Sequence, residues 1–280
     1  HRLEDVFELC DRVSVMKDGK LVKTLEVSET HEDELSTLMV GRATKATMFR
    51  QDRAAQVGTE VVLSVKDLSL PGRYKDITFD LHAGEILGIG GLLGCGNEDL
   101  ALSLFGILRP TAGNVILRGK SVRFTQPRAA IRERVAYMPK DRDREGLILR
   151  LPLKDNIALA ALPWLSRFNF IRGSRIAQIA GRLIKALGVA CRNIHDIPLN
   201  LSGGNRQKVV LAKWMVRNNE VLILNNPTRG IDVGAKSEIY GMMRDMARQG
   251  IAMILISHEL PVLIGMCDRI LIMRRGEISA

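Results

Sequence analysis

The chain carries an internal repeat, and no other feature limits its architecture as strongly. Residues 1–20 read HRLEDVFELCDRVSVMKDGK, and residues 258–277 read HELPVLIGMCDRILIMRRGE. They align without a gap at an offset of 258 − 1 = 257 residues, with a His, a Cys-Asp-Arg triplet and a Gly in matching positions. A match at one fixed offset predicts a repeated unit of that length. Residues 1–29 are then the tail of a first copy, residues 30–58 a linker, and residues 59–280 the second copy.

The predicted linker differs in character from the units on either side. Residues 30–58 are polar and charged and are weakly periodic after Val40, which is typical of a linker. The sequence begins with His1 rather than Met, and its last residues run directly out of an expected strand and turn. Both ends are therefore expected to be cuts in a longer sequence.

The composition suits a folded domain and argues against some functions. Apolar residues make up 46% of the 280 residues, enough for a substantial core. The net charge of +10 would suit nucleic acid, an anionic membrane surface or nucleotide phosphates. Aromatic residues are only 4%, which weakens a base-stacking role. The four cysteines lack metal-like spacing, and no apolar run approaches the roughly 18 residues that span a bilayer.

The second copy alternates strand and helix patterns, which predicts an α/β fold with a parallel sheet. The expected strands are residues 61–65, 77–81, 85–90, 135–138, 221–224, 251–257 and 270–273. The expected helices lie near residues 176–187, 205–216 and 235–248.

A glycine-rich stretch, GEILGIGGLLGCGNEDL, follows a strand and opens a helix. Three of its glycines have the spacing of a phosphate-binding P-loop: Gly91, Gly94 and Gly96. Glycines let backbone N–H groups face phosphate oxygens, and a working P-loop then supplies Lys for phosphate and Ser or Thr for Mg²⁺. Here those positions hold Asn97 and Glu98. Glycines alone would be a weak signal, since an ordinary tight turn also uses them.

Three further motifs follow in a fixed order. Residues 201–207 read LSGGNRQ and open a helix with Ser202 at an N-cap-like position. Residues 221–236 read VLILNNPTRGIDVGAK, an apolar strand that ends in two polar residues. His258 then ends the next apolar strand. Four motifs in this order are far more specific than any one of them.

These motifs resemble those of the ABC transporter ATPases, especially the tandem ATP-binding proteins of bacterial monosaccharide importers. The resemblance covers essentially the whole chain. Its carrying segments are MVGR (39–42), GEILGIGGLLG (84–94), the P-x-D-R-x-x-x-G segment (139–146), LSGGNRQK (201–208) and PTRGIDVGAK (227–236). It implies an α/β P-loop NTPase core of ABC type, an antiparallel β subdomain, and a helical signature subdomain at about residues 147–205.

The chain departs from the family at its own nucleotide site. The family ends the strand at 221–224 in Asp-Glu, for Mg²⁺ and for the attacking water. Here both are amides, Asn225 at the metal position and Asn226 at the catalytic position. Lys140 stands roughly where other cassettes have Gln or Glu, and Tyr74, the only aromatic candidate for an adenine platform, is in the wrong register. We therefore expect weak binding of ATP and Mg²⁺ and little or no hydrolysis by the isolated chain.

The altered residues and the intact ones are expected to belong to different sites. ABC cassettes pair head to tail, so each nucleotide lies between one P-loop and the signature of the other cassette. The resemblance makes His258 the switch histidine of the altered site. It assigns to the site of the first cassette the switch histidine His1 and the signature residues Ser202, Gly203 and Gly204. Asp232 falls at the D-loop position.

The resemblance implies an ATP-binding subunit of a bacterial sugar importer, peripheral to the cytoplasmic face of the inner membrane. Its expected partners are a first cassette, a homodimeric permease docked near residues 139–199, and a periplasmic sugar-binding protein, with no nucleic acid. One alternative is a non-catalytic structural or regulatory cassette, or a degenerate remnant. Another is a tandem ABC translation factor that binds RNA, against which the PTRGIDVGAK and MVGR motifs speak.

Overall fold

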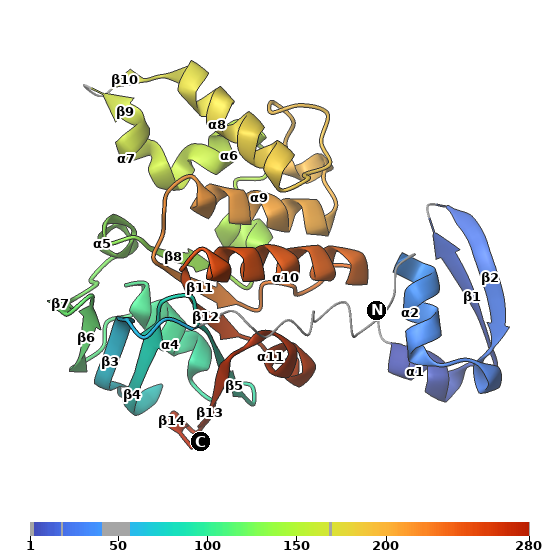
Figure 1. Ribbon diagram of the computed structural model, residues 1–280, viewed down its shortest axis with the longest axis horizontal. Helices are drawn as coiled ribbons and strands as arrows, with labels where there is room; N and C mark the ends of the chain where they lie inside the picture. The colour runs from blue at the N-terminus through green and yellow to red at the C-terminus, as the bar shows by residue number, and fades with distance from the viewer. Residues whose placement is uncertain (1–2, 18, 41–56, 168–169, 280) are drawn as a thin grey trace.

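The computed structural model describes residues 3–17, 19–40, 57–167 and 170–279 (Figure 1). His1 and most of the predicted linker lie outside these residues.

A six-stranded sheet forms the centre of the molecule, in the order β14-β13-β5-β12-β11-β8. Its strands are β5 (Ile86–Gly91), β8 (Val135–Met138), β11 (Val221–Asn225), β12 (Ala252–Ile256), β13 (Arg269–Arg274) and β14 (Glu277–Ile278). All pairs are parallel except β13–β14. Every residue of β11 and β12 is buried, as expected for apolar strands covered on both faces.

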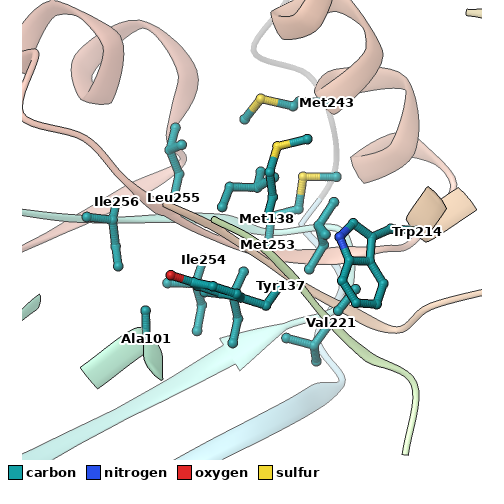
Figure 2. Packing of buried hydrophobic residues seen from close by; sticks show 14 of the residues in the cluster. Ala101, Tyr137, Met138, Trp214, Val221, Met243, Met253, Ile254, Leu255 and Ile256 are labelled. Atoms are coloured by element: carbon teal, nitrogen blue, oxygen red, sulfur yellow. The ribbon is translucent and has the colours of Figure 1, made fainter. Parts of the chain in front are cut away.

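Helices cover both faces of this sheet. They include α4 (Asn97–Leu104), α9 (Gly203–Met215), α10 (Val233–Arg248) and α11 (Leu260–Met266). Figure 2 shows Met138, Met253 and Met243 gathered on one side of the sheet, while Tyr137 and Ile254 point to the side of α4. Adjacent strand residues point to opposite faces, so each strand contributes to both layers of the core.

The predicted antiparallel subdomain is present. It is a four-stranded sheet in the order β4-β3-β6-β7, with strands β3 (Val61–Leu70), β4 (Tyr74–His82), β6 (Ala112–Leu117) and β7 (Lys120–Val122). α5 (Pro127–Arg132) leads from it into β8.

Short helices occupy the region between β8 and the signature helix α9. They are a π-helix (Arg142–Gly146), α6 (Leu153–Ala158), α7 (Leu162–Leu165), α8 (Gly173–Ala186) and 3-10 turns at Leu159–Ala161 and Pro198–Asn200. Two short strands, β9 (Ser166–Arg167) and β10 (Phe170–Ile171), lie between α7 and α8 in the sequence and pair antiparallel. No helix among the described residues is long and apolar enough to cross a membrane.

The N-terminal elements repeat the C-terminal ones in three dimensions. They are α1 (Leu3–Leu9), β1 (Arg12–Lys17) and β2 (Lys20–Glu26), followed by a 3-10 turn (Val27–Glu29) and α2 (Glu32–Val40). α1, β1 and β2 begin at the repeat partners of the residues that begin α11, β13 and β14. The sequence repeat is therefore a structural repeat.

The first part of the predicted linker is helical. α2 lies within residues 30–58, contacts β1 and α10, and buries Leu35 completely. Thr30 Oγ1 donates to Glu34 Oε2 at 2.9 Å, and Lys23 forms an ion pair with the same carboxylate. The helix is held by tertiary contacts rather than by strong periodicity, which is why the polar composition did not indicate it.

Candidate functional site

The carboxyl ends of four parallel strands meet at one edge of the central sheet. The loop after β5 holds the P-loop glycines, Lys140 follows β8, Asn226 follows β11 and His258 follows β12. A cavity of about 300 Å³ opens there, lined by Leu93, Lys140, Asn226, Thr228, Arg229, Ser257, His258 and Glu259. Ligands of open α/β sheets bind at this edge, and three of the four predicted motifs meet there: the P-loop, the end of β11 and His258.

The P-loop backbone requires glycine for two different reasons. Gly94 has φ +78° and faces open space, so only its backbone conformation excludes a side chain. Gly96 has φ +100°, and a Cβ added there would lie 2.5 Å from the carbonyl oxygen of Arg73. Gly96 therefore holds the loop tightly against β4 as α4 begins.

Gly96→Ala is expected to destabilise the chain by about 2–4 kcal/mol, because left-handed strain adds to a backbone collision. Gly94→Ala, the matched control, meets no atom and is expected to cost about 1 kcal/mol from strain alone. Urea unfolding of both variants measures the difference. Equal losses would contradict the close approach of Gly96 to Arg73.

Asn97 is folded into the protein rather than turned toward a ligand. Its side chain is 2% exposed, and its Oδ1 accepts the backbone N–H of Glu98 at 2.8 Å. Its Nδ2 is buried without a hydrogen-bond partner among the described residues. An N–H at the start of α4, which would otherwise face a phosphate, is thus bound to a side chain of the chain itself.

Glu98 bonds two side chains that line the cavity, Lys140 and His258. Its Oε1 lies 2.6 Å from Lys140 Nζ and 2.9 Å from His258 Nε2. Burial alone would raise the pKa of Glu98, but the hydrogen bonds from Lys140 and His258 outweigh it and hold the pKa below its usual value. The Glu98 carboxylate is therefore bonded to the Lys140 and His258 side chains, which could otherwise bind an anionic ligand.

The two amides after β11 also satisfy one another. Asn226 Nδ2 donates to Asn225 Oδ1 at 2.9 Å, and Asn226 Oδ1 accepts the backbone N–H of His258 at 3.1 Å. Asn225 Nδ2 donates to the hydroxyl of Tyr137 at 3.2 Å. Burial raises the pKa of Tyr137 to about 12, so this hydroxyl stays neutral at physiological pH. No group of three or more carboxylate, His or Cys side chains suited to a metal occurs in the described part of the chain.

The signature residues lie apart from this cavity and do not line it. Ser202 caps α9, is exposed, and accepts from the side-chain amide of Asn205 at 2.9 Å. A Cβ on Gly204 would lie 2.5 Å from that of Ala235, so this glycine allows α9 to pack on α10. Asp232 caps α10 by accepting the N–H of Ala235 at 2.8 Å, and it too is exposed.

The structure adds site residues to which the sequence analysis gave no role. Thr228 and Arg229, which lie within the PTRGIDVGAK motif, line the cavity together with Ser257 and Glu259. Their positions directly after β11 and β12 could have indicated them, since the motifs already marked those strand ends. Tyr74 is only 3% exposed, so it belongs to the core and provides no adenine platform.

A sheet of this order, with a P-loop-like turn, a capped signature helix and a histidine after β12, defines an ATP-binding cassette. The sequence model described as ABC transporter matches residues 74–229, more than half of the chain. The chain belongs to the ABC transporter family of ATP-binding proteins.

Relatives and solved structures agree with this assignment. A ribose import ATP-binding protein of Rubrobacter xylanophilus is 44% identical over 279 residues, covering 100% of this chain and 53% of the relative. A putative ribose/galactose/methyl galactoside import ATP-binding protein of Rhizobium meliloti is 41% identical, covering 99% and 55%. A nucleotide-free ATP-binding cassette from an ABC transporter has a TM-score of 0.68 at 16% identity, covering 79% of this chain and 90% of that one. The chain spans about half the length of the curated relatives it matches.

Proposed function

We propose that this chain is part of the ATP-binding subunit of a bacterial carbohydrate importer, where its signature completes the nucleotide site of a first cassette. The observation that carries the proposal is a separation in space. The residues that depart from the family's motifs lie in one place, and the signature residues that match the family lie in another. Asn226 lines one cavity together with Lys140 and His258, and both of these side chains bond Glu98. Asn97 binds the backbone N–H of Glu98, and Asn226 binds Asn225. Ser202, in contrast, is exposed on a capped helix and does not line that cavity. The names of the relatives supply the substrate class.

The cassette's own cavity does not fit a magnesium–nucleotide complex ready for hydrolysis. Asn225 offers a metal only a neutral carbonyl, and that oxygen already accepts from Asn226. Glu98 places a carboxylate where phosphate would bring further negative charge. Neither amide can take a proton from water as a carboxylate can. We therefore assign no hydrolytic step to this cavity.

The repeated Cys-Asp-Arg triplet supports a preceding cassette. In the second copy every member of the triplet contacts the start of β5. A Cβ on Gly88 would lie 2.7 Å from Cys267 Sγ, Asp268 Oδ2 accepts the N–H of Ile86 at 2.8 Å, and Arg269 Nε lies 3.0 Å from Glu85 Oε1. The triplet at residues 10–12 is expected to hold an equivalent strand of the first copy.

Exposure at the repeat positions agrees with this expectation. Met273 is 1% exposed, whereas its partner Met16 is 64% exposed; Met266 is 4% exposed, whereas Leu9 is 81% exposed. β13 pairs with β5, but β1 pairs only with β2 among the described strands. The apolar surface of β1 and α1 thus has the chemistry to pack against the core of a first cassette.

The region between β8 and α9 is the proposed docking surface for a membrane permease. Its exposed apolar residues are Ile148, Leu151, Trp164, Ile171 and Leu199. Such residues favour a protein partner over nucleic acid. In the proposed assembly the chain lies at the cytoplasmic face of the inner membrane, and a periplasmic protein delivers the sugar to the permease. The alternative is a non-catalytic structural or regulatory cassette. It is supported by the Glu98 network, that is, the bonds from Glu98 to Lys140 and His258 within the chain.

A chimera tests the proposal. The part of the Rubrobacter xylanophilus ribose import ATP-binding protein that this chain does not match would be joined to residues 1–280 and expressed in a strain lacking the original protein. Ribose uptake is expected to return, because the chimera would restore one complete composite site. The same chimera with Ser202→Ala serves as the control and is expected not to support uptake. A stable chimera that fails to restore uptake, or one that works equally well without Ser202, would contradict the proposal.

A further inference from the structure

The segment Pro139–Gly146 connects the altered cavity to the signature helix, and Arg142 lies at its centre. Arg142 Nη1 donates to the carbonyl of Arg229 at 2.8 Å, and its Nη2 donates to the carbonyl of Gly230 at 3.3 Å. These two carbonyls belong to the loop that leads from β11 to Asp232. A planar guanidinium can bond two successive carbonyls at once, which a lysine ammonium does less specifically.

The same guanidinium is packed against the signature. A Cβ added to Gly203 would lie 2.8 Å from Arg142 Nη2 and 3.3 Å from the carbonyl oxygen of Gly230. The Arg142 side chain is 16% exposed. Although it is long, it cannot move aside freely, because moving would break its bonds to Arg229 and Gly230. Gly203 is therefore glycine partly because Arg142 fills the adjoining space.

The neighbours of Arg142 fix its own position. Asp141 Oδ1 accepts the N–H groups of Asp143 and Arg144, which closes the turn. Asp143 pairs with Arg206 of α9 at 3.0 Å, and Lys213 of the same helix donates to the carbonyl of Gly146 at 2.7 Å. These bonds hold the segment Pro139–Gly146 against α9 and thereby fix the position of the Arg142 guanidinium.

We propose that Arg142 is a positioning residue that holds the signature at Ser202–Gly204 and the D-loop at Arg229–Asp232 in one arrangement. The inference rests on the proposed function, since both elements would face the nucleotide of the first cassette. Lys140, two residues earlier, bonds Glu98 in the cassette's own cavity. The short run from Lys140 to Arg142 therefore links the altered cavity to the groups that complete the other site.

A double-mutant cycle on this chain tests the contact without relying on the proposed function. Gly203→Ala lowers the melting temperature, because its methyl group meets the anchored guanidinium. In an Arg142→Ala background the same methyl group has space, so Gly203→Ala costs less than half as much. A smaller loss of stability from Gly203→Ala in the Arg142→Ala background supports the contact between position 203 and the Arg142 side chain. Equal losses in both backgrounds overturn the inference and leave the proposed function untouched.

Turnover by the two-cassette chimera tests the positioning role. Arg142→Gln is expected to lower kcat by roughly 10²-fold, because a small misplacement of a catalytic element has an effect of that size. KM for ATP is expected to change little, because in the proposed assembly the P-loop of the first cassette, and not Arg142, contacts the phosphates. Arg142→Lys recovers only part of the loss, since one ammonium replaces a two-donor fork.

The matched control is Arg248→Gln, which removes an exposed arginine of α10 that pairs with Asp245 and leaves turnover unchanged. If Arg142→Gln keeps normal kcat while Ser202→Ala loses it, the positioning role is wrong and the proposed function stands. If Ser202→Ala also keeps normal kcat, the proposed function itself fails.

Discussion

Ser202→Ala in the two-cassette chimera is expected to reduce ATP turnover by roughly 10²-fold or more, the loss that follows removal of one transition-state hydrogen-bond donor. Asn226→Ala is expected to leave turnover close to that of the unmutated chimera. The expected asymmetry arises because Ser202 is exposed and would face the first cassette in the proposed assembly, whereas Asn226 donates to Asn225 and accepts from the backbone N–H of His258 within its own cavity. Steady-state phosphate release measures both variants.

The control for Ser202 is Ser174→Ala, an exposed serine of α8 outside the signature. It removes the same hydroxyl without touching either composite site. Circular dichroism melting checks that each variant is folded. Comparable turnover in the Ser202 and Ser174 variants, or a large loss on changing Asn226, would show that the active site was assigned to the wrong cassette.

Converting Asn97 to Lys and Glu98 to Thr together is expected to raise the affinity of the chain for ATP by about 100-fold, or about 2.7 kcal/mol. The double substitution removes the internal carboxylate that binds Lys140 and His258, and it adds a cation at the start of α4. Charge-assisted hydrogen bonds of about 1.5–3 kcal/mol each are sufficient for this gain. Titration calorimetry without added metal isolates the phosphate contribution.

Two single variants separate the causes of that gain. Glu98→Thr alone is expected to give part of it by releasing Lys140 and His258. Glu259→Gln, the matched control, removes one negative charge from the lining of the same cavity but leaves the Glu98 network intact, because Glu259 pairs with Lys236. If Glu259→Gln matches Glu98→Thr, general charge rather than the internal network governs binding. An unchanged affinity in the double variant would rule out the network as the obstacle.

The bonds from Glu98 to Lys140 and His258 are also expected to make the free energy of unfolding depend on pH. The pKa of Glu98 is lowered in the folded chain relative to its ordinary value of 4.5. Its stabilising contribution is thus present above pH 4.5 and is lost as the pH falls through the folded pKa. This contribution should be absent from the Glu98→Thr protein.

Several elements could be predicted from local sequence, for identifiable reasons. β11 and β12 are short, continuous apolar runs, and such runs are typical of buried parallel strands. Ser202 and Asp232 were recognised from motifs, and both are helix caps in the structure. α2 was not predicted, since its stability depends on Leu35 packing within the fold. β6 was also missed, because its exposed first half lacks an apolar pattern.

The sequence by itself determined the family, the order of the motifs and the polar residues that stand at each motif position, because each of these is a property of residue type and spacing. Only the tertiary structure decided what those polar residues bond. Residues far apart in the chain meet at one edge of a parallel sheet, where Glu98 bonds Lys140 and His258. The packing of Arg142 against Gly203 likewise depends on how two segments approach, and no local pattern encodes that distance. The repeat could be recognised from the sequence alone. The contacts that the Cys-Asp-Arg triplet at residues 267–269 makes with β5 and with Glu85 just before it could be found only in the tertiary structure.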